Sequence, residues 1–249
     1  MFTIEDRIRV RERVLQLASS DSRVTAGAVV GSLALSDGDR WSDLDLTFAV
    51  ADEFSIFDVL EDWTKTITTE FESARLFDLP SGPSIYRVFL LPNCLQFDLS
   101  FTPASKFGAT SPKFKLLFGN AVERQYTPEP SAHELFGYAV HHALRTRFCI
   151  ERGKFWQAEY WINETRNYAL RLACLRHGLS ARFGRGFDDL PIDVRDKFAT
   201  SLTASLDRGD LLHAFQVVVE GFLTIAEGFP GLAEKVKPQL LELMIEWDS

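Results

Sequence analysis

The spacing of the apolar residues changes after Pro128-Glu129-Pro130, and this change divides the sequence into two kinds of structure. Before it, apolar and polar residues alternate, as in 95–101, which is typical of strands with one buried face. After it, Ser131 with Glu134 three positions later predicts a helix start. The helical periodicity then predicts helices over 132–151, 155–177, 192–207, 210–227 and 231–246. The sequence therefore predicts an α+β protein, with a mixed β-sheet domain at 1–125 and a helical bundle at 130–249.

The first half is expected to combine helices with strands. Thr3 and Asp6 form a predicted capping box before an amphipathic helix, and a second helix is predicted over 54–71. The segment 80–83 is a predicted turn, and 102–130 is a predicted irregular connection with a short amphipathic piece at 114–118. The predicted strands are 24–31, 44–51, 85–91 and 94–101, of which the last two form a hairpin.

Asp43 and Asp45 lie one residue apart in a segment that is predicted to be a strand. Successive strand side chains point to opposite faces, so both carboxylates share one face, while Leu44 and Leu46 point to the other. Two neighbouring carboxylates stay ionised at low cost only when a positive charge lies between them. The pair therefore predicts a divalent cation, and Mg²⁺ prefers a few carboxylates together with substrate phosphates.

Asp98 supplies a third carboxylate, in the middle of the polar face of the strand at 95–101. If that strand is a neighbour of the first, three carboxylates meet at one site, which could hold two metal ions and activate a hydroxyl for attack on phosphorus. Gly31 and Ser32 follow the buried strand at 24–31. Gly31 lets the backbone come close to a ligand, and Ser32 offers a hydroxyl and an amide to a phosphate.

The order Gly31-Ser32, Ser42-Asp43-Leu44-Asp45-Leu46 and a later Phe-Asp-Leu strand at 97–99 resembles the DNA polymerase beta-like nucleotidyltransferase superfamily. The resemblance covers roughly residues 24–101. It implies that the glycine and serine hold a triphosphate, that the first two aspartates bind Mg²⁺, and that the third is another metal ligand or the base. The spacer departs from the family, which often has Arg-Gly soon after Gly-Ser. Here Gly38 and Arg40 come later, and Arg40 and Ser42 are expected at the nucleotide.

The resemblance also implies an activity. The chain is expected to be a cytoplasmic bacterial enzyme that uses one or two Mg²⁺ ions to transfer a nucleoside monophosphate. The donor is ATP or another nucleoside triphosphate, with AMP as the expected group, and pyrophosphate leaves. The acceptor is a hydroxyl of a small molecule such as an aminoglycoside or lincosamide antibiotic, because resistance nucleotidyltransferases share this two-domain organisation.

Two other functions stay open. One is a protein- or tRNA-modifying nucleotidyltransferase of the toxin–antitoxin type, and the other is a non-catalytic nucleotide-binding protein. The net charge of −8 argues against the tRNA acceptor and against nucleic-acid partners in general, because such binding relies on neutralising phosphates. The complete set of three carboxylates argues against a simple binder, which has no need of Asp98.

Composition excludes several other classes. The cysteines, Cys94, Cys149 and Cys174, are widely spaced, so neither a disulfide framework nor a zinc site is expected. The N-terminal residues lack an apolar run, so no signal peptide is expected. No stretch reaches the roughly 18 consecutive apolar residues of a membrane span, so no membrane association is predicted.

The segment 152–167 is rich in aromatic residues and is predicted to be helical. Glu159 and Arg166 fall on one face, and Trp156 and Tyr160 on an adjacent one. These four residues are candidates for binding the acceptor in a cleft between the two halves, where the aromatic rings would stack on a ring and Glu159 would pair with an ammonium group. The alternative is an ion pair that supports the bundle.

The loop at 182–189 contains two arginines, Arg182 and Arg185, and two glycines. Its arginines could hold phosphate oxygens. Equally, the loop could be a structural connection, with Asp189 near the start of the next helix.

Overall fold

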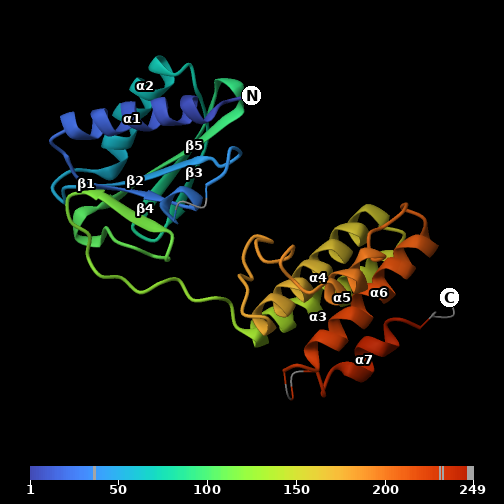
Figure 1. Cartoon of the computed structure of the whole chain (residues 1–249). Helices are drawn as coiled ribbons and strands as arrows, with labels where there is room; N and C mark the ends of the chain where they lie inside the picture. Colours follow the sequence, from blue (N-terminus) through green and yellow to red (C-terminus); the bar gives the residue numbers. More distant parts are fainter. Residues whose placement is uncertain (36–37, 230, 232, 246–249) are drawn as a thin grey trace. The chain divides into compact units, whose positions relative to one another are not determined.

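A computed structural model of the chain describes residues 1–35, 38–229, 231 and 233–245. The chain divides into two compact units, Met1–Thr127 and Pro128–Ser249 (Figure 1). Each unit has its own hydrophobic core. Strands occur only in the first unit as far as the structure describes the chain, and the second unit is built from helices. The predicted α+β class is therefore confirmed.

In the described part of the first unit, six strands form one mixed sheet, in the order β3-β4-β5-β2-β1-β6 (Figure 1). β2 and β5 pair in parallel, and all other neighbouring strands pair antiparallel. The parallel pair places the two strands that were predicted to carry the aspartates side by side. The strands are β1 Val24–Val30, β2 Leu44–Val50, β3 Ala74–Ser81, β4 Ser84–Leu91, β5 Leu95–Pro103 and β6 Phe114–Phe118.

Helices α1, Ile4–Ser20, and α2, Ile56–Glu70, cover the same face of this sheet (Figure 1). The predicted capping box of Thr3 and Asp6 is present at the start of α1. In the core, the Trp63 ring of α2 lies 5.2 Å from that of Phe48 and 5.0 Å from that of Phe101. Because these apolar side chains point toward the helices, the alternate side chains of β2 and β5 point to the opposite face.

The sheet has two edge strands that the sequence pattern did not predict. β3 was missed because Leu76, Phe77 and Leu79 are all exposed, so the strand lacks a buried alternate face. It is held to β4 by Arg87, whose buried guanidinium donates two hydrogen bonds of 2.7 Å to Asp78. β6 lies in the segment that was predicted to be an irregular connection, and it pairs with β1.

The predicted hairpin of β4 and β5 is confirmed. The predicted turn at 80–83 is shorter than expected, since β3 continues to Ser81 and β4 begins at Ser84. Gly82 lies between them with φ +57°, a backbone conformation that glycine adopts at low cost.

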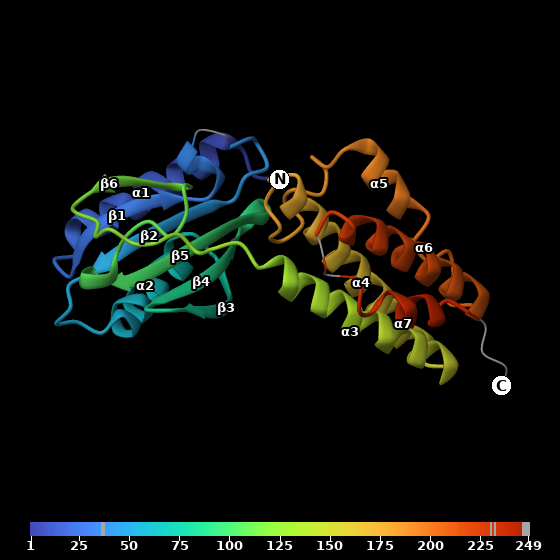
Figure 2. The ribbon, with the colours of Figure 1, turned by 90° about the horizontal axis from the view of Figure 1, so that it is seen from below.

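The second unit has α3, α4 and α6 packed against one another (Figure 2). The helices at 132–151 and 155–177 agree with α3 and α4, whereas α5 ends well before the predicted residue 207. Its end is explained by Ser201, whose hydroxyl donates to the Phe198 carbonyl and whose own carbonyl accepts from Arg166. The last predicted helix shortens to α7, and residue 246 lies outside the described part. The bounds are α3 Ala132–Glu151, α4 Phe155–Arg176, α5 Ile192–Ala199, α6 Arg208–Ala226 and α7 Lys237–Glu242.

Of the helices within the described ranges, α6 alone is long and apolar enough to cross a membrane. Its most apolar window is 61% buried inside the protein, where Phe215 and Phe222 are fully enclosed. This burial is what the central helix of a folded bundle shows.

His142 of α3 predicts an acid-sensitive helical unit. Its ring is buried and lies 4.9 Å from the Trp161 ring and 5.1 Å from the Tyr168 ring. Burial lowers the pKa of His142 to about 4, and the nearby His141 and Arg145 act in the same direction. In the unfolded chain His142 therefore binds a proton near pH 6.5, whereas in the folded unit it stays neutral at this pH. We expect the free energy of unfolding to have its full value above pH 6.5 and to decrease by about 3 kcal/mol as the pH decreases to 4.

Urea unfolding at pH 7 and pH 5, followed by circular dichroism, measures this loss. His142→Phe keeps a ring in place and removes the titration, so the stability difference between the two pH values should shrink. His133→Gln changes an exposed histidine of the same helix and should behave like the wild type. A His142→Phe protein that loses as much stability at pH 5 as the wild type would contradict the assignment.

Candidate functional site

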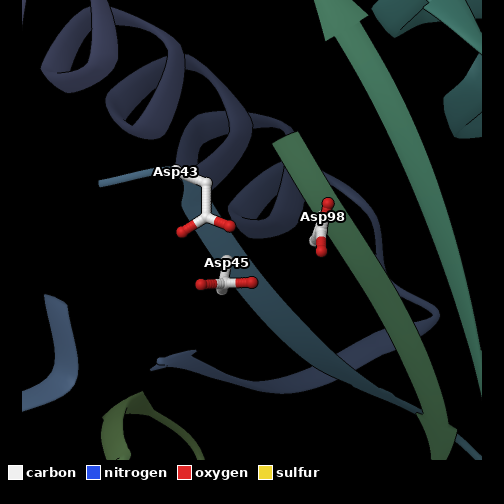
Figure 3. A group of neighbouring side chains, drawn as sticks. All are labelled: Asp43, Asp45 and Asp98. Atoms are coloured by element: carbon white, nitrogen blue, oxygen red, sulfur yellow. The ribbon is translucent and has the colours of Figure 1, made fainter. Parts of the chain in front are cut away.

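Asp43, Asp45 and Asp98 lie together on the first unit (Figure 3). One carboxylate oxygen from each residue lies within 4.8 Å of the others, and all three side chains are half-buried. The three residues that were predicted from separate parts of the sequence are thus brought to one place. Carboxylate oxygens at this spacing are suitable ligands for Mg²⁺, so the donor set fits this ion.

The pairing of β2 with β5 explains this grouping. In the parallel register, Asp45 is the direct partner of Asp98, and the neighbouring pair is Leu44 with Phe97. Leu44 and Phe97 are fully buried on the helix-covered face, so the aspartates point to the opposite face. β2 begins at Leu44, as predicted for the strand at 44–51, so Asp43 lies immediately before the strand.

Gly31 brings the backbone against one of these carboxylates. It has φ +72°, and a Cβ atom at this position would lie 2.3 Å from Oδ2 of Asp45. The backbone N–H of Gly31 donates to the carbonyl of Lys113 at 3.2 Å, so this amide is engaged within the protein. The role that the structure supports for Gly31 is therefore to leave room for the Asp45 carboxylate.

A hollow of about 510 Å³ opens beside Asp43. Its polar lining includes Ser32, Ser42 and Gln96, and Trp41 lies at its rim with 62% of its side chain exposed. Ser32 begins the short 3₁₀ helix η1, Ser32–Leu35. Both serines that were predicted at the nucleotide thus border the hollow, next to the first carboxylate.

The loop before Asp43 is tied to helix α1. The buried guanidinium of Arg7 donates hydrogen bonds to the carbonyls of Asp39 and Ser42. The Ser42 hydroxyl in turn lies 3.1 Å from Oδ1 of Asp39. Arg40, also predicted at the nucleotide, is exposed, and its guanidinium lies 4.4 Å from the centre of the Trp41 ring. Arg40 is not among the described residues that line the hollow.

The electrostatics of the cluster favour a proton or a cation. Burial raises the pKa of Asp98, and the charge of Asp43 raises it further, while a hydrogen bond from Gln96 opposes the rise. That bond runs from Nε2 of Gln96 to Oδ1 of Asp98 and is 3.0 Å long. A bound divalent cation would replace the mutual repulsion of the carboxylates by attraction.

Three residues near the cluster were not predicted. Arg7 holds the Asp43 loop, Gln96 orients Asp98, and Tyr86 lies close enough to Asp45 to sense its charge. Burial raises the pKa of Tyr86, and Asp45 adds to this rise. Only Gln96 carried a usable signal, since its position two residues before Asp98 places both side chains on one face of the strand.

The candidates for acceptor binding belong to the helical unit. Trp156 and Tyr160 are 79% and 53% exposed, which is unusual for aromatic residues, and Glu159 is half-buried. Arg166 is also half-buried, and it donates to the Ser201 carbonyl and to Oδ1 of Asn163, both at 2.8 Å. Among the ion pairs of the described residues, none joins Glu159 to Arg166 within 4.0 Å.

Comparisons with known proteins give distant likenesses at the level of structure. No protein-family model matches the chain, and no curated protein matches it. Among solved structures, the fold is similar to the crystal structure of an aminoglycoside 6-adenyltransferase from Bacillus subtilis, with a TM-score of 0.43 and 13% identity. The match covers 96% of this chain and 99% of that one. A likeness this distant does not define an activity, so the function has to be argued from the carboxylates themselves.

Proposed function

We propose that this chain is a Mg²⁺-dependent nucleotidyltransferase that transfers a nucleoside monophosphate, AMP from ATP, to a hydroxyl of a small molecule. The observation that carries the proposal is the pairing of Asp45 with Asp98 across two parallel strands, with Asp43 beside them. Three half-buried carboxylates within 4.8 Å of one another are costly unless a cation offsets their charges. A triphosphate bound through Mg²⁺ supplies such a cation together with its own anionic partner.

Each residue has a distinct part in this reaction. Asp43 and Asp45 would hold the metal ion, and bound Mg²⁺ would neutralise charge that develops around the α-phosphorus. Asp98 would accept the proton of the acceptor hydroxyl, since its carboxylate lies beside the two that would hold the metal ion. The hydroxyl oxygen forms a bond to the α-phosphorus, the bond from that phosphorus to the bridging oxygen breaks, and pyrophosphate leaves.

Contacts to the nucleotide are assigned to the residues beside the hollow. Ser32 would donate a hydroxyl hydrogen bond to a phosphate oxygen, and Ser42 would do the same by releasing Oδ1 of Asp39, while Gly31 keeps the Asp45 carboxylate free of steric conflict. Arg40 is exposed on the same loop, where its side chain could reach a bound triphosphate by leaving the Trp41 ring. For the acceptor, the net charge of −8 favours a cationic compound such as an aminoglycoside antibiotic.

A transfer assay tests the proposal. The protein is incubated with each nucleoside triphosphate labelled at the α-phosphorus, and with small-molecule, RNA and protein acceptors in turn. We expect label to pass to a small molecule only with Mg²⁺, fastest from ATP, with release of pyrophosphate. Conversion of the labelled triphosphate to a labelled nucleoside diphosphate, which would mean transfer of the γ-phosphate, or no transfer of label to any acceptor, would contradict the assignment.

Asp98→Asn provides a sharper test of the base. Asparagine has the same shape and leaves an oxygen for the Gln96 amide, but it cannot take a proton. We expect the rate of the chemical step to fall by about 10²–10⁴-fold, with the affinity for Mg²⁺-ATP changed by less than about threefold.

Single-turnover kinetics and calorimetry separate these two quantities. Glu53→Gln, which changes an exposed carboxylate of the same unit, is the control and should leave both unchanged. If Asp98→Asn lost nucleotide affinity but kept its rate per bound nucleotide, Asp98 would be a metal ligand and not the base.

A further inference from the structure

The helical unit has a pocket of about 670 Å³, a volume typical of small-molecule sites. One wall is a single face of α4, which presents Asn163, Arg166, Asn167 and Arg171 at steps of three and four residues. The other wall is the loop that follows α4, with Arg182 and Phe183. The two walls place three guanidinium-bearing side chains around one hollow, although the protein as a whole is acidic.

The two arginines of α4 that line the pocket, Arg166 and Arg171, form no ion pair with a carboxylate among the described residues. Arg166 donates to Ser201 and Asn163, which are neutral. Arg171 donates from Nε to the Ala181 carbonyl at 2.7 Å, and its guanidinium lies 4.7 Å from the Tyr168 ring centre. Neither arginine has an ion pair within the described ranges.

Burial adds to the demand for an anion at Arg166. It lowers the pKa of this guanidinium, and the charge of Glu159 offsets only part of that effect. Arginine stays protonated in proteins, so the side chain keeps a positive charge that its partners do not neutralise. Planar guanidinium groups bind phosphate oxygens in pairs of parallel hydrogen bonds.

The loop wall is held in place before any ligand binds. The Arg182 guanidinium donates to the carbonyl of Pro128 and lies 3.7 Å from Glu129, which also accepts from the backbone N–H of Ala181. The bond from Arg171 to Ala181 ties the same loop to α4. A site fixed in this way loses little conformational entropy on binding.

Phe183 is the most exposed large apolar side chain of the described residues, at 85%, and it lines this pocket. Its φ of +55° is unfavourable for a residue with a side chain. Strained residues of this kind cluster at ligand-binding sites. An exposed ring beside guanidinium groups is the arrangement that stacks on a flat ring of a charged ligand.

We propose that this pocket binds a small organic phosphate that carries a flat ring, such as a nucleoside monophosphate. The phosphate lies against Arg166 and Arg171, the ring stacks on Phe183, and Asn163 and Asn167 offer amides to the polar groups between. The inference rests on the pocket alone and does not depend on the carboxylate site.

Calorimetry in EDTA tests the pocket with three probes: AMP, ribose 5-phosphate without the ring, and adenosine without the phosphate. We expect AMP to bind about tenfold more tightly than ribose 5-phosphate, and adenosine to bind at least tenfold more weakly than AMP. Phe183→Leu should lower the affinity for AMP about tenfold and leave the affinity for ribose 5-phosphate unchanged, because stacking on an aromatic ring contributes about 1–3 kcal/mol per base. Because Phe183 is exposed, the substitution should not disturb the fold.

Arg166→Gln should lower the affinity for both phosphate-bearing probes at least tenfold. Arg195 is an exposed arginine of α5 outside the pocket, and Arg195→Gln should lower neither affinity. The inference is overturned if AMP does not bind, if adenosine binds as tightly as AMP, or if Phe183→Leu binds AMP like the wild type. Asp45→Asn should bind AMP normally. If AMP binding were lost in that variant alone, the ligand would lie at the carboxylates. This result would overturn the inference and leave the nucleotidyltransferase assignment intact.

Discussion

Asp45→Asn is expected to lower nucleotide transfer by about a thousandfold or more while the fold stays intact. The substitution keeps the shape of the side chain and removes one of the two charges that would hold the metal ion, an interaction that supplies several kcal/mol of stabilisation in the transition state. The leucines on either side are fully buried on the other face, so the core does not change. Asp43→Asn should have the same effect, since its carboxylate belongs to the same cluster.

Three measurements together decide this point. Transfer rates should fall in both variants, calorimetry should show weaker binding of Mg²⁺-ATP, and thermal unfolding should show no loss of stability relative to the wild type. Asp196→Asn, at an exposed position of α5, removes the same charge elsewhere and should change none of the three. Wild-type turnover in either cluster variant would exclude the residue from the catalytic site.

Gly31→Ala should also be severe, with activity reduced by about a hundredfold or more. The new methyl group would lie 2.3 Å from Oδ2 of Asp45, so the carboxylate or the backbone has to move. Displacements of about 1 Å in a catalytic group cost about two orders of magnitude in rate. The φ of +72° adds a strain of about 1–2 kcal/mol, which should appear as a lower unfolding temperature.

Gly82→Ala separates these two effects. Gly82 also has a positive φ, of +57°, but no atom lies within 4 Å of its would-be Cβ. This control should lose about the same stability and keep full activity. If Gly31→Ala were as active as Gly82→Ala, the close approach of Gly31 to Asp45 would have no catalytic importance.

The carboxylate cluster was predictable because its signal is local. Alternation places Asp43 and Asp45 on one face, and the pattern at 95–101 does the same for Asp98. Their adjacency was only an assumption, since nothing in either segment states that β2 pairs with β5 in parallel. The pairing depends on how the hydrophobic faces of the whole sheet fit beneath α1 and α2.

The rest could not be read from patterns, because it depends on contacts between distant segments. Arg7 holds the loop at Asp39 and Ser42, a contact that an amphipathic helix pattern does not reveal. β3 could not be predicted because an exposed edge strand shows no alternation of apolar and polar residues. The pocket of the helical unit was predicted only in part. The loop arginines were recognised from the sequence, but the packing of this loop against one face of α4 depends on the turn that joins the helix to the loop.

The parallel pairing of β2 and β5 links the site to the completion of folding. Strands that pair in parallel cannot be joined by a tight hairpin, and here the chain passes through α2, β3 and β4 between Asp45 and Asp98. Contacts between segments this far apart form slowly, because the intervening loop has to close first. A chain still being synthesised, or cut before Leu95, carries the first two aspartates without the third. The three carboxylates therefore come together only in molecules in which β5 has paired with β2.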